Sequence, residues 1–95
     1  MSKEVIIYTS ETGGLFVKKY TTEMINIVRG LTGKEPTVVP LNRVDDETKK
    51  RREKVWEKSG LRAVYPLLFV DEEFVGTMEQ VVDLNEREEL KDKLI

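Results

Sequence analysis

The chain contains no cysteine and no histidine among its 95 residues. Without cysteine it has no disulfide and no thiol nucleophile, and thiol–disulfide exchange, which needs an attacking thiolate, has no side chain to carry it. Without histidine it lacks the usual acid–base side chain near neutral pH, and with both residues missing it has no thiolate or imidazole ligand for a metal. We therefore expect a protein that is not an enzyme and that holds neither a metal nor a cofactor.

Long apolar runs and a strong charge of one sign are also missing. No stretch approaches the roughly 20 apolar residues of a membrane span, and the polar start Met1–Glu4 has no signal-peptide core. Sixteen basic and eighteen acidic residues leave a net charge of -2, which gives the whole chain no attraction for nucleic acid or an anionic membrane. The sequence predicts a cytoplasmic protein of one domain, 1–95, whose partner is neither nucleic acid nor a membrane.

One basic run stands apart, Lys49-Lys50-Arg51-Arg52. It is either a nuclear import signal, which would add the nucleus to the expected location, or the solvated part of a helix paired internally through Asp46–Lys50 and Glu47–Arg51. Four consecutive helical residues point around most of a turn and form no stripe by themselves. This geometry favours the solvated helix.

The apolar pattern changes its period along the N-terminal third. Val5 to Thr9 is a short β-branched and aromatic run typical of a buried strand. From Val17 to Leu31 the apolar residues recur at three- and four-residue steps, which indicates an amphipathic helix. Thr12 is a candidate N-cap of this helix, and Gly30 and Gly33 are candidate stops.

The middle of the chain continues the alternation. Pro36 to Leu41 is predicted as a second strand, with Pro40 at its end or on an edge of the sheet. Asp45 to Lys58 is predicted as a helix with acids in its first turn, where the helix dipole favours them. Few apolar residues mark its inner face, so we expect a peripheral helix anchored by Val55 and Trp56.

The C-terminal third predicts a strand, a turn and a strand over Pro66 to Val75, with a turn that lacks glycine. Two short helices should follow, one opened by a capping box, Thr77–Gln80, and one with Asn85 in the cap role. The order of elements is therefore β-α-β-α-β-β-α plus a final helical turn or two.

This order, with a proline opening the third strand and a glycine closing the fourth, resembles the thioredoxin fold in its glutaredoxin form. The likeness is sharpest in the run from Val64 to Gly76 and in the tail Leu84-Asn85-Glu86 with Glu89-Leu90-Lys91. The turn Ser10-Glu11-Thr12-Gly13 resembles one branch, the SH3-binding glutamate-rich protein family, whose small members are glutaredoxin-like domains without the catalytic cysteines. The resemblance implies an α/β fold with a four-stranded mixed sheet and a cis Tyr65–Pro66 bond.

The resemblance also locates the missing thiols. Glutaredoxins carry the redox motif between the first strand and the first helix, and Gly13-Gly14-Leu15-Phe16 fills that slot here. Gly13 stands at the nucleophile's place and Phe16 at the resolving position. SH3 binding does not carry over, because Pro36 and Pro40 are one residue too far apart for a PxxP motif.

Two further interpretations of the opening turn remain. Thr9 to Gly13 also resembles the flavodoxin loop that wraps the phosphate of FMN, but a flavodoxin-like sheet needs five parallel strands and only one crossover precedes the hairpin. Glutathione binding in a vestigial redox domain is the other alternative. Ser10 replaces the basic residue that many glutaredoxins carry there, and Glu79 would repel a glutathione carboxylate.

The hypothesis that we favour is a binding module without catalysis. In thioredoxin folds the turn after the first strand, the cis-proline and the loop before the third helix converge on one surface, and here that surface would be an apolar groove for a peptide or an unidentified protein. Phe16 either forms an aromatic lip or turns inward into the space left by a cysteine. We expect a monomer or a weak dimer. The predicted groove comprises Thr12, Gly13, Gly14, Leu15, Phe16, Tyr65, Pro66, Gly76, Thr77 and Met78.

Overall fold

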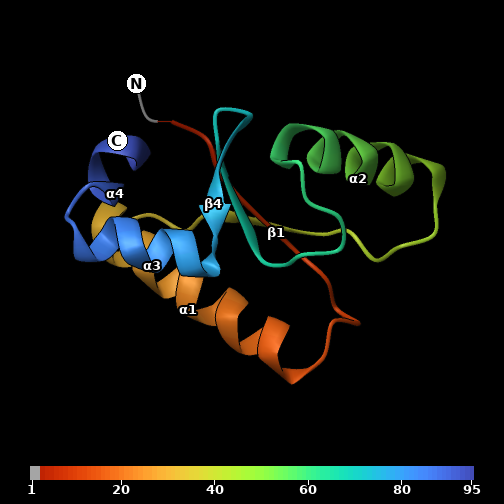
Figure 1. The fold of residues 1–95 in the computed structure, drawn as a ribbon, viewed down its shortest axis with the longest axis horizontal. Helices are drawn as coiled ribbons and strands as arrows, with labels where there is room; N and C mark the ends of the chain where they lie inside the picture. Colours follow the sequence, from red (N-terminus) through yellow and green to blue (C-terminus); the bar gives the residue numbers. More distant parts are fainter. Residues whose placement is uncertain (1–2) are drawn as a thin grey trace.

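The structure, a computed structural model, describes residues 3–95, which form one four-stranded sheet with helices on both of its faces (Figure 1). The elements in chain order are β1 (Val5–Thr9), α1 (Leu15–Thr32), β2 (Thr37–Pro40), α2 (Asp46–Ser59), β3 (Leu67–Val70), β4 (Glu73–Thr77), α3 (Met78–Glu86) and α4 (Leu90–Leu94). The strand order is β2-β1-β3-β4, with β1 and β2 parallel and the other neighbours antiparallel. The predicted element order and the mixed four-stranded sheet are confirmed.

Side chains of the central strands alternate between two cores. Ile7 and Leu68 belong to the core that includes residues of α1, α3 and α4, and Phe69 belongs to the core that includes Val55 of α2. Figure 1 shows α2 apart from the other three helices, across the sheet. All four residues of β3 are buried. An uninterrupted apolar strand such as β3 is what burial on both faces requires.

Helix α1 ends at the second of its two candidate stops. Gly33 has a φ of 71°, and its N–H donates to the carbonyl of Arg29 at 2.8 Å, whereas Gly30 lies inside the helix. The left-handed conformation at the C-cap favours glycine because it has no Cβ. Neither α1 nor any other helix within residues 3–95 combines the length and apolarity needed to cross a membrane.

Strand β2 forms one edge of the sheet, and proline blunts that edge. The N–H of Leu41 donates to the carbonyl of Thr9 at 2.8 Å, so residue 41 faces β1. Because successive residues of a strand alternate their polar groups between the two sides, Pro40 faces away from the sheet. Proline has no N–H, so position 40 offers an incoming strand no donor. The prediction that Pro40 lies on an edge is confirmed.

Helix α2 is closed at both ends by local hydrogen bonds. The Asp45 side chain accepts from the N–H of Thr48 at 2.7 Å, and the N–H of Gly60 donates to the carbonyl of Trp56 at 2.9 Å. Only Thr48 and Val55 of this helix are fully buried, which confirms its peripheral position.

The internal ion pairing predicted for α2 is half confirmed. Glu47 and Arg51 approach to 3.6 Å, whereas Asp46 and Lys50 form no ion pair within the described residues.

The β3–β4 turn achieves a tight geometry without glycine. Asp71 and Glu72 both have positive φ values, 49° and 68°, the combination that a two-residue type I′ turn requires. The Asp71 carboxylate accepts from the N–H of Glu4 at 2.8 Å, and its own N–H donates to the carbonyl of Glu4 at 2.9 Å. These bonds to the start of β1 hold the turn in place.

The capping box at Thr77 is confirmed, with hydrogen bonds in both directions between Thr77 and Gln80. The prediction of a helix capped by Asn85 is wrong. Helix α3 continues through Asn85, and α4 starts only at Leu90, behind Glu89, which makes no side-chain cap bond.

Candidate functional site

The turn between β1 and α1 is held by hydrogen bonds within itself and to the segment after β2. The N–H of Gly13 donates to the carbonyl of Ser10 at 3.4 Å, and the hydroxyls of Ser10 and Thr12 lie 3.3 Å apart. The N–H of Glu11 donates to the side-chain oxygen of Asn42 at 3.0 Å, which joins the turn to the segment after β2.

The prediction that Thr12 caps α1 is wrong. The N-cap is Gly14, which provides no side chain, and Leu15 is the first helical residue. Gly14 has a φ of 89°, a conformation that favours glycine, so the chain can turn at this residue, and the actual cap lies two positions after the predicted one. The Thr12 hydroxyl bonds within the turn instead.

Gly13, which the resemblance to glutaredoxins puts at the nucleophile's place, has no room for a side chain. A Cβ built on Gly13 would lie 2.7 Å from Cγ2 of Val17 and 3.0 Å from its Cβ. Valine has one strongly preferred rotamer in a helix and cannot easily turn aside. The turn therefore lacks both the thiol and the space that a cysteine side chain would need.

Leu15 and Phe16 project into solvent. Leu15 is 85% exposed and Phe16 is 72% exposed, and the Phe16 ring stacks on Tyr20 with centroids 6.2 Å apart. Of the two alternatives for Phe16, the structure shows the outward one. Leu15, Phe16 and Tyr20 form an exposed apolar ridge on the first turns of α1, which we call the α1 ridge.

The sheet register brings the other predicted segments to the same end of the molecule. Tyr8 in β1 lies opposite Leu67 in β3, which in turn lies opposite Thr77 in β4. Pro66, directly before β3, therefore lies beside the end of β1, where the turn begins. The Tyr65–Pro66 bond is cis, Tyr65 is half-buried and Pro66 is buried.

Gly76, Thr77 and Met78 are largely occupied by internal contacts. A Cβ on Gly76 would lie 2.8 Å from Cβ of Gln80, so glycine lets the capping box close against β4. The Thr77 hydroxyl accepts from the N–H of Gln80, and the half-buried Met78 packs against the core that contains Ile7 and Leu68. These residues support the end of the sheet more than they present free groups.

A hollow of about 550 Å³ opens beside the turn, but its walls differ from the predicted groove. It contains Gly14 and Leu15 of the predicted set and none of the residues from 65 to 78. The helix contributes three polar lining residues, Lys18, Thr21 and Thr22, that the sequence did not predict as part of a site. Their three- and four-residue spacing places them on one side of α1. The lining residues are Thr9, Ser10, Glu11, Gly14, Leu15, Lys18, Thr21 and Thr22.

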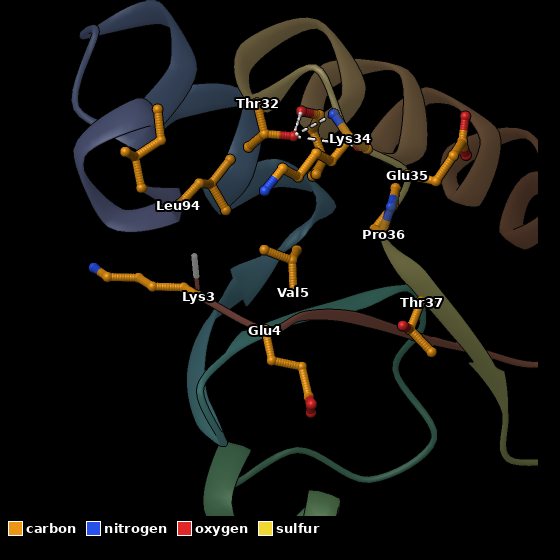
Figure 2. A pocket seen from close by; sticks show the side chains of 11 residues that line it. Lys3, Glu4, Val5, Thr32, Lys34, Glu35, Pro36, Thr37 and Leu94 are labelled. Carbon is orange, nitrogen blue, oxygen red and sulfur yellow. Dashed lines mark hydrogen bonds between the residues drawn. The ribbon is translucent and has the colours of Figure 1, made fainter. Parts of the chain in front are cut away.

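A second hollow, of about 360 Å³, lies where the N-terminal part of β1 meets the ends of α1 and α4 (Figure 2). Val5 and Leu94 face it, and Lys34 extends across it toward Leu94. The Thr32 hydroxyl donates to the carbonyl of Val28 at 2.8 Å and accepts from the N–H of Lys34 at 3.1 Å. The polar groups at its rim thus bond to each other within the chain. Its apolar wall is the end of the core that contains Ile7 and Leu68.

The molecule has a glutaredoxin-like fold and its sequence contains no cysteine. Among solved structures it is similar to the C. albicans actin interacting protein Aip5, with 25% identity, 97% of this chain and 88% of that chain covered, and a TM-score of 0.76.

Glutaredoxins share the fold at lower identity. The dithiolic glutaredoxin 2-C-Grx1 of Trypanosoma brucei brucei is 17% identical over 98% of this chain and 88% of that one, with a TM-score of 0.71. Wheat glutaredoxin is 17% identical over 95% and 77%, also with a TM-score of 0.71. Neither a protein-family model nor a curated protein matches the chain.

Proposed function

We propose that this chain is a non-catalytic protein-interaction module that binds a protein partner at the β1–α1 end of the sheet, chiefly through the α1 ridge. The observation that carries the proposal is the exposure of Leu15 and Phe16, 85% and 72%, side by side at the start of one helix. Exposed apolar side chains that cluster in this way are typical of protein interaction sites. The resemblance to the SH3-binding glutamate-rich family, whose small members lack the catalytic cysteines, agrees with this proposal.

The chemistry of the turn supports binding without redox catalysis. Thiol–disulfide exchange needs a thiolate, the chain contains no cysteine, and Val17 fills the space beside Gly13. We expect no turnover in a hydroxyethyl disulfide reduction assay with glutathione. Measurable activity would contradict the non-enzymatic part of the proposal.

Actin is the partner that we propose to test first, because the similar C. albicans protein is an actin interacting protein. Purified wild-type chain should sediment with filamentous actin. If it stays in the supernatant at saturating actin, actin is wrong as the partner.

Leu15→Ser plus Phe16→Ser tests the surface itself. Both side chains are exposed, so the double variant should keep the thermal stability of the wild type. It should bind filamentous actin at least tenfold more weakly, as expected when apolar anchors of an interface are removed. Val44→Ser is the matched control, because Val44 is 97% exposed in the segment before α2. Equal binding by the double variant and the wild type would show that the α1 ridge is not the interface.

A further inference from the structure

Helix α2 leaves part of its face of the sheet uncovered. Figure 1 shows this helix on that face, away from α1, α3 and α4. Only Thr48 and Val55 of its residues are buried. One helix with so narrow an apolar contact cannot fill the space over the neighbouring strands. A hollow of about 290 Å³ remains, lined by Tyr8, Glu47, Lys50, Arg51, Lys54, Val55, Lys58, Phe69 and Glu72.

The helix wall of this hollow is basic. Lys50, Lys54 and Lys58 recur every four residues along one side of α2, and Arg51 lies beside them. These four basic residues form a stripe along the helix. Only two of them, Lys50 and Arg51, belong to the basic run of residues 49–52.

Among the described residues, two of these four cations have a polar partner and two have no ion pair. Arg51 pairs with Glu47 at 3.6 Å, and the Lys58 ammonium donates to the carbonyl of Glu72 at 3.1 Å. Lys50 and Lys54 form no ion pair within residues 3–95. Even with both glutamates counted, the lining side chains carry an excess of positive charge.

The sheet wall of the hollow is aromatic. The rings of Tyr8 and Phe69 meet edge to face with centroids 5.1 Å apart. Burial raises the pKa of the Tyr8 hydroxyl, so this group keeps its proton at neutral pH and can donate a hydrogen bond.

We propose that this hollow is a second binding site, which takes a planar aromatic group bearing a phosphate. The half-buried ring of Tyr8, backed by the buried ring of Phe69, would contact the aromatic part, and Lys50 and Lys54 would hold the phosphate. A phosphate suits this wall better than a carboxylate, because it carries up to two negative charges and three acceptor oxygens. No residue of this site belongs to the predicted groove or the α1 ridge.

Nuclear magnetic resonance titration of the isotope-labelled chain tests the site with defined probes. O-phospho-L-tyrosine represents a phosphorylated side chain and adenosine monophosphate represents a nucleotide; L-tyrosine and inorganic phosphate each carry one half of the proposed ligand. We expect amide shifts centred on Tyr8, Lys50 and Lys54, with at least one aromatic phosphate binding more tightly than either half. The tighter of the two aromatic phosphates identifies the source of the ligand.

The matched variants separate a site from general charge attraction. Lys50→Met plus Lys54→Met should weaken binding about tenfold, as expected for two ionic contacts of about 0.7 kcal/mol each. Lys49→Met plus Lys91→Met removes the same charge from exposed positions outside the hollow and should bind like the wild type. Equal weakening by both double variants, or no localised shifts with either aromatic phosphate at millimolar concentration, would overturn the proposal.

Discussion

The hydroxyl oxygens of Thr9 and Thr21 lie 2.7 Å apart in the interior and join the end of β1 to α1. The Thr21 hydroxyl also lies 2.7 Å from the carbonyl of Val17, which can only accept, so Thr21 donates there. Thr21 has one hydroxyl hydrogen, and therefore Thr9 must donate to Thr21. These two consecutive hydrogen bonds join the end of β1 to the first turns of α1 and so fix the orientation of the helix relative to the sheet.

Thr9→Val should lower the free energy of unfolding by about 1–2 kcal/mol, because it removes the donor and leaves a buried acceptor on Thr21 unpaired. Thr9→Val plus Thr21→Val should cost less than the sum of the two single changes, since the groups form one unit. Urea denaturation of the four proteins measures the coupling. Strict additivity would mean that the hydroxyls do not interact.

Gly13→Ala should destabilise the chain by about 1–3 kcal/mol, the usual cost of inserting a methyl group into occupied space. Its added Cβ would meet Val17 at 2.7 Å. The penalty should shrink in the Val17→Ala background, where the obstructing methyl groups are gone. Thermal unfolding of the double-mutant cycle measures this, and a Gly13→Ala protein as stable as the wild type would show that the turn yields freely.

Asp45→Asn should make the stability of the protein depend less on pH in the acid range. Hydrogen bonds from the N–H and hydroxyl of Thr48 hold the pKa of Asp45 below its ordinary 3.8. A lowered pKa in the folded state stabilises the protein fully above pH 3.8, and that contribution is lost as pH falls through the folded-state pKa.

The advantage of the wild type over Asp45→Asn should therefore narrow as pH falls below 3.8. Melting temperatures of both proteins across this range check the prediction. Asparagine keeps an acceptor for the Thr48 N–H but has an NH2 group in place of the oxygen that accepts from the Thr48 hydroxyl. The pH dependence of the difference, rather than its size, therefore reports the carboxylate. A difference that stays constant with pH would rule out the carboxylate as the cause.

Pro40→Ala should increase self-association relative to the wild type. The substitution supplies an outward N–H on the edge strand β2, where Val38 is already 39% exposed. Unpaired donors on an edge strand are available for pairing with another chain. Sedimentation velocity over a concentration series measures the effect, and Val38→Ala, which leaves the blocked edge unchanged, serves as the control. Unchanged association in Pro40→Ala would show that the proline is not what protects the edge.

The fold was predictable because its signals are local or strongly periodic. The apolar run of β3 reports burial on both faces, and Thr77 with Gln80 carries a complete capping box in four residues. Tight turns without glycine are harder to predict. The β3–β4 turn depends on Asp71 bonding to Glu4, a residue distant in sequence.

The candidate site was only partly predictable. Thr12 and Gly14 both suit an N-cap, and the choice between them sets the direction of Leu15 and Phe16, which the residues by themselves do not decide. The hollow under α2 depends on how far the helix stands from the sheet. That distance follows from packing around Val55, and a helix pattern contains no such information.

The contact between position 13 and Val17 also constrains protein engineering. A cysteine introduced at position 13 alone would bring its Cβ to 2.7 Å from a methyl group of Val17, so the turn or the valine would have to shift. Installing a thiol in this turn therefore calls for a second change, a smaller residue at position 17. The inner side of the turn is filled, whereas the outer surface of the helix at Leu15 and Phe16 is open to substitution.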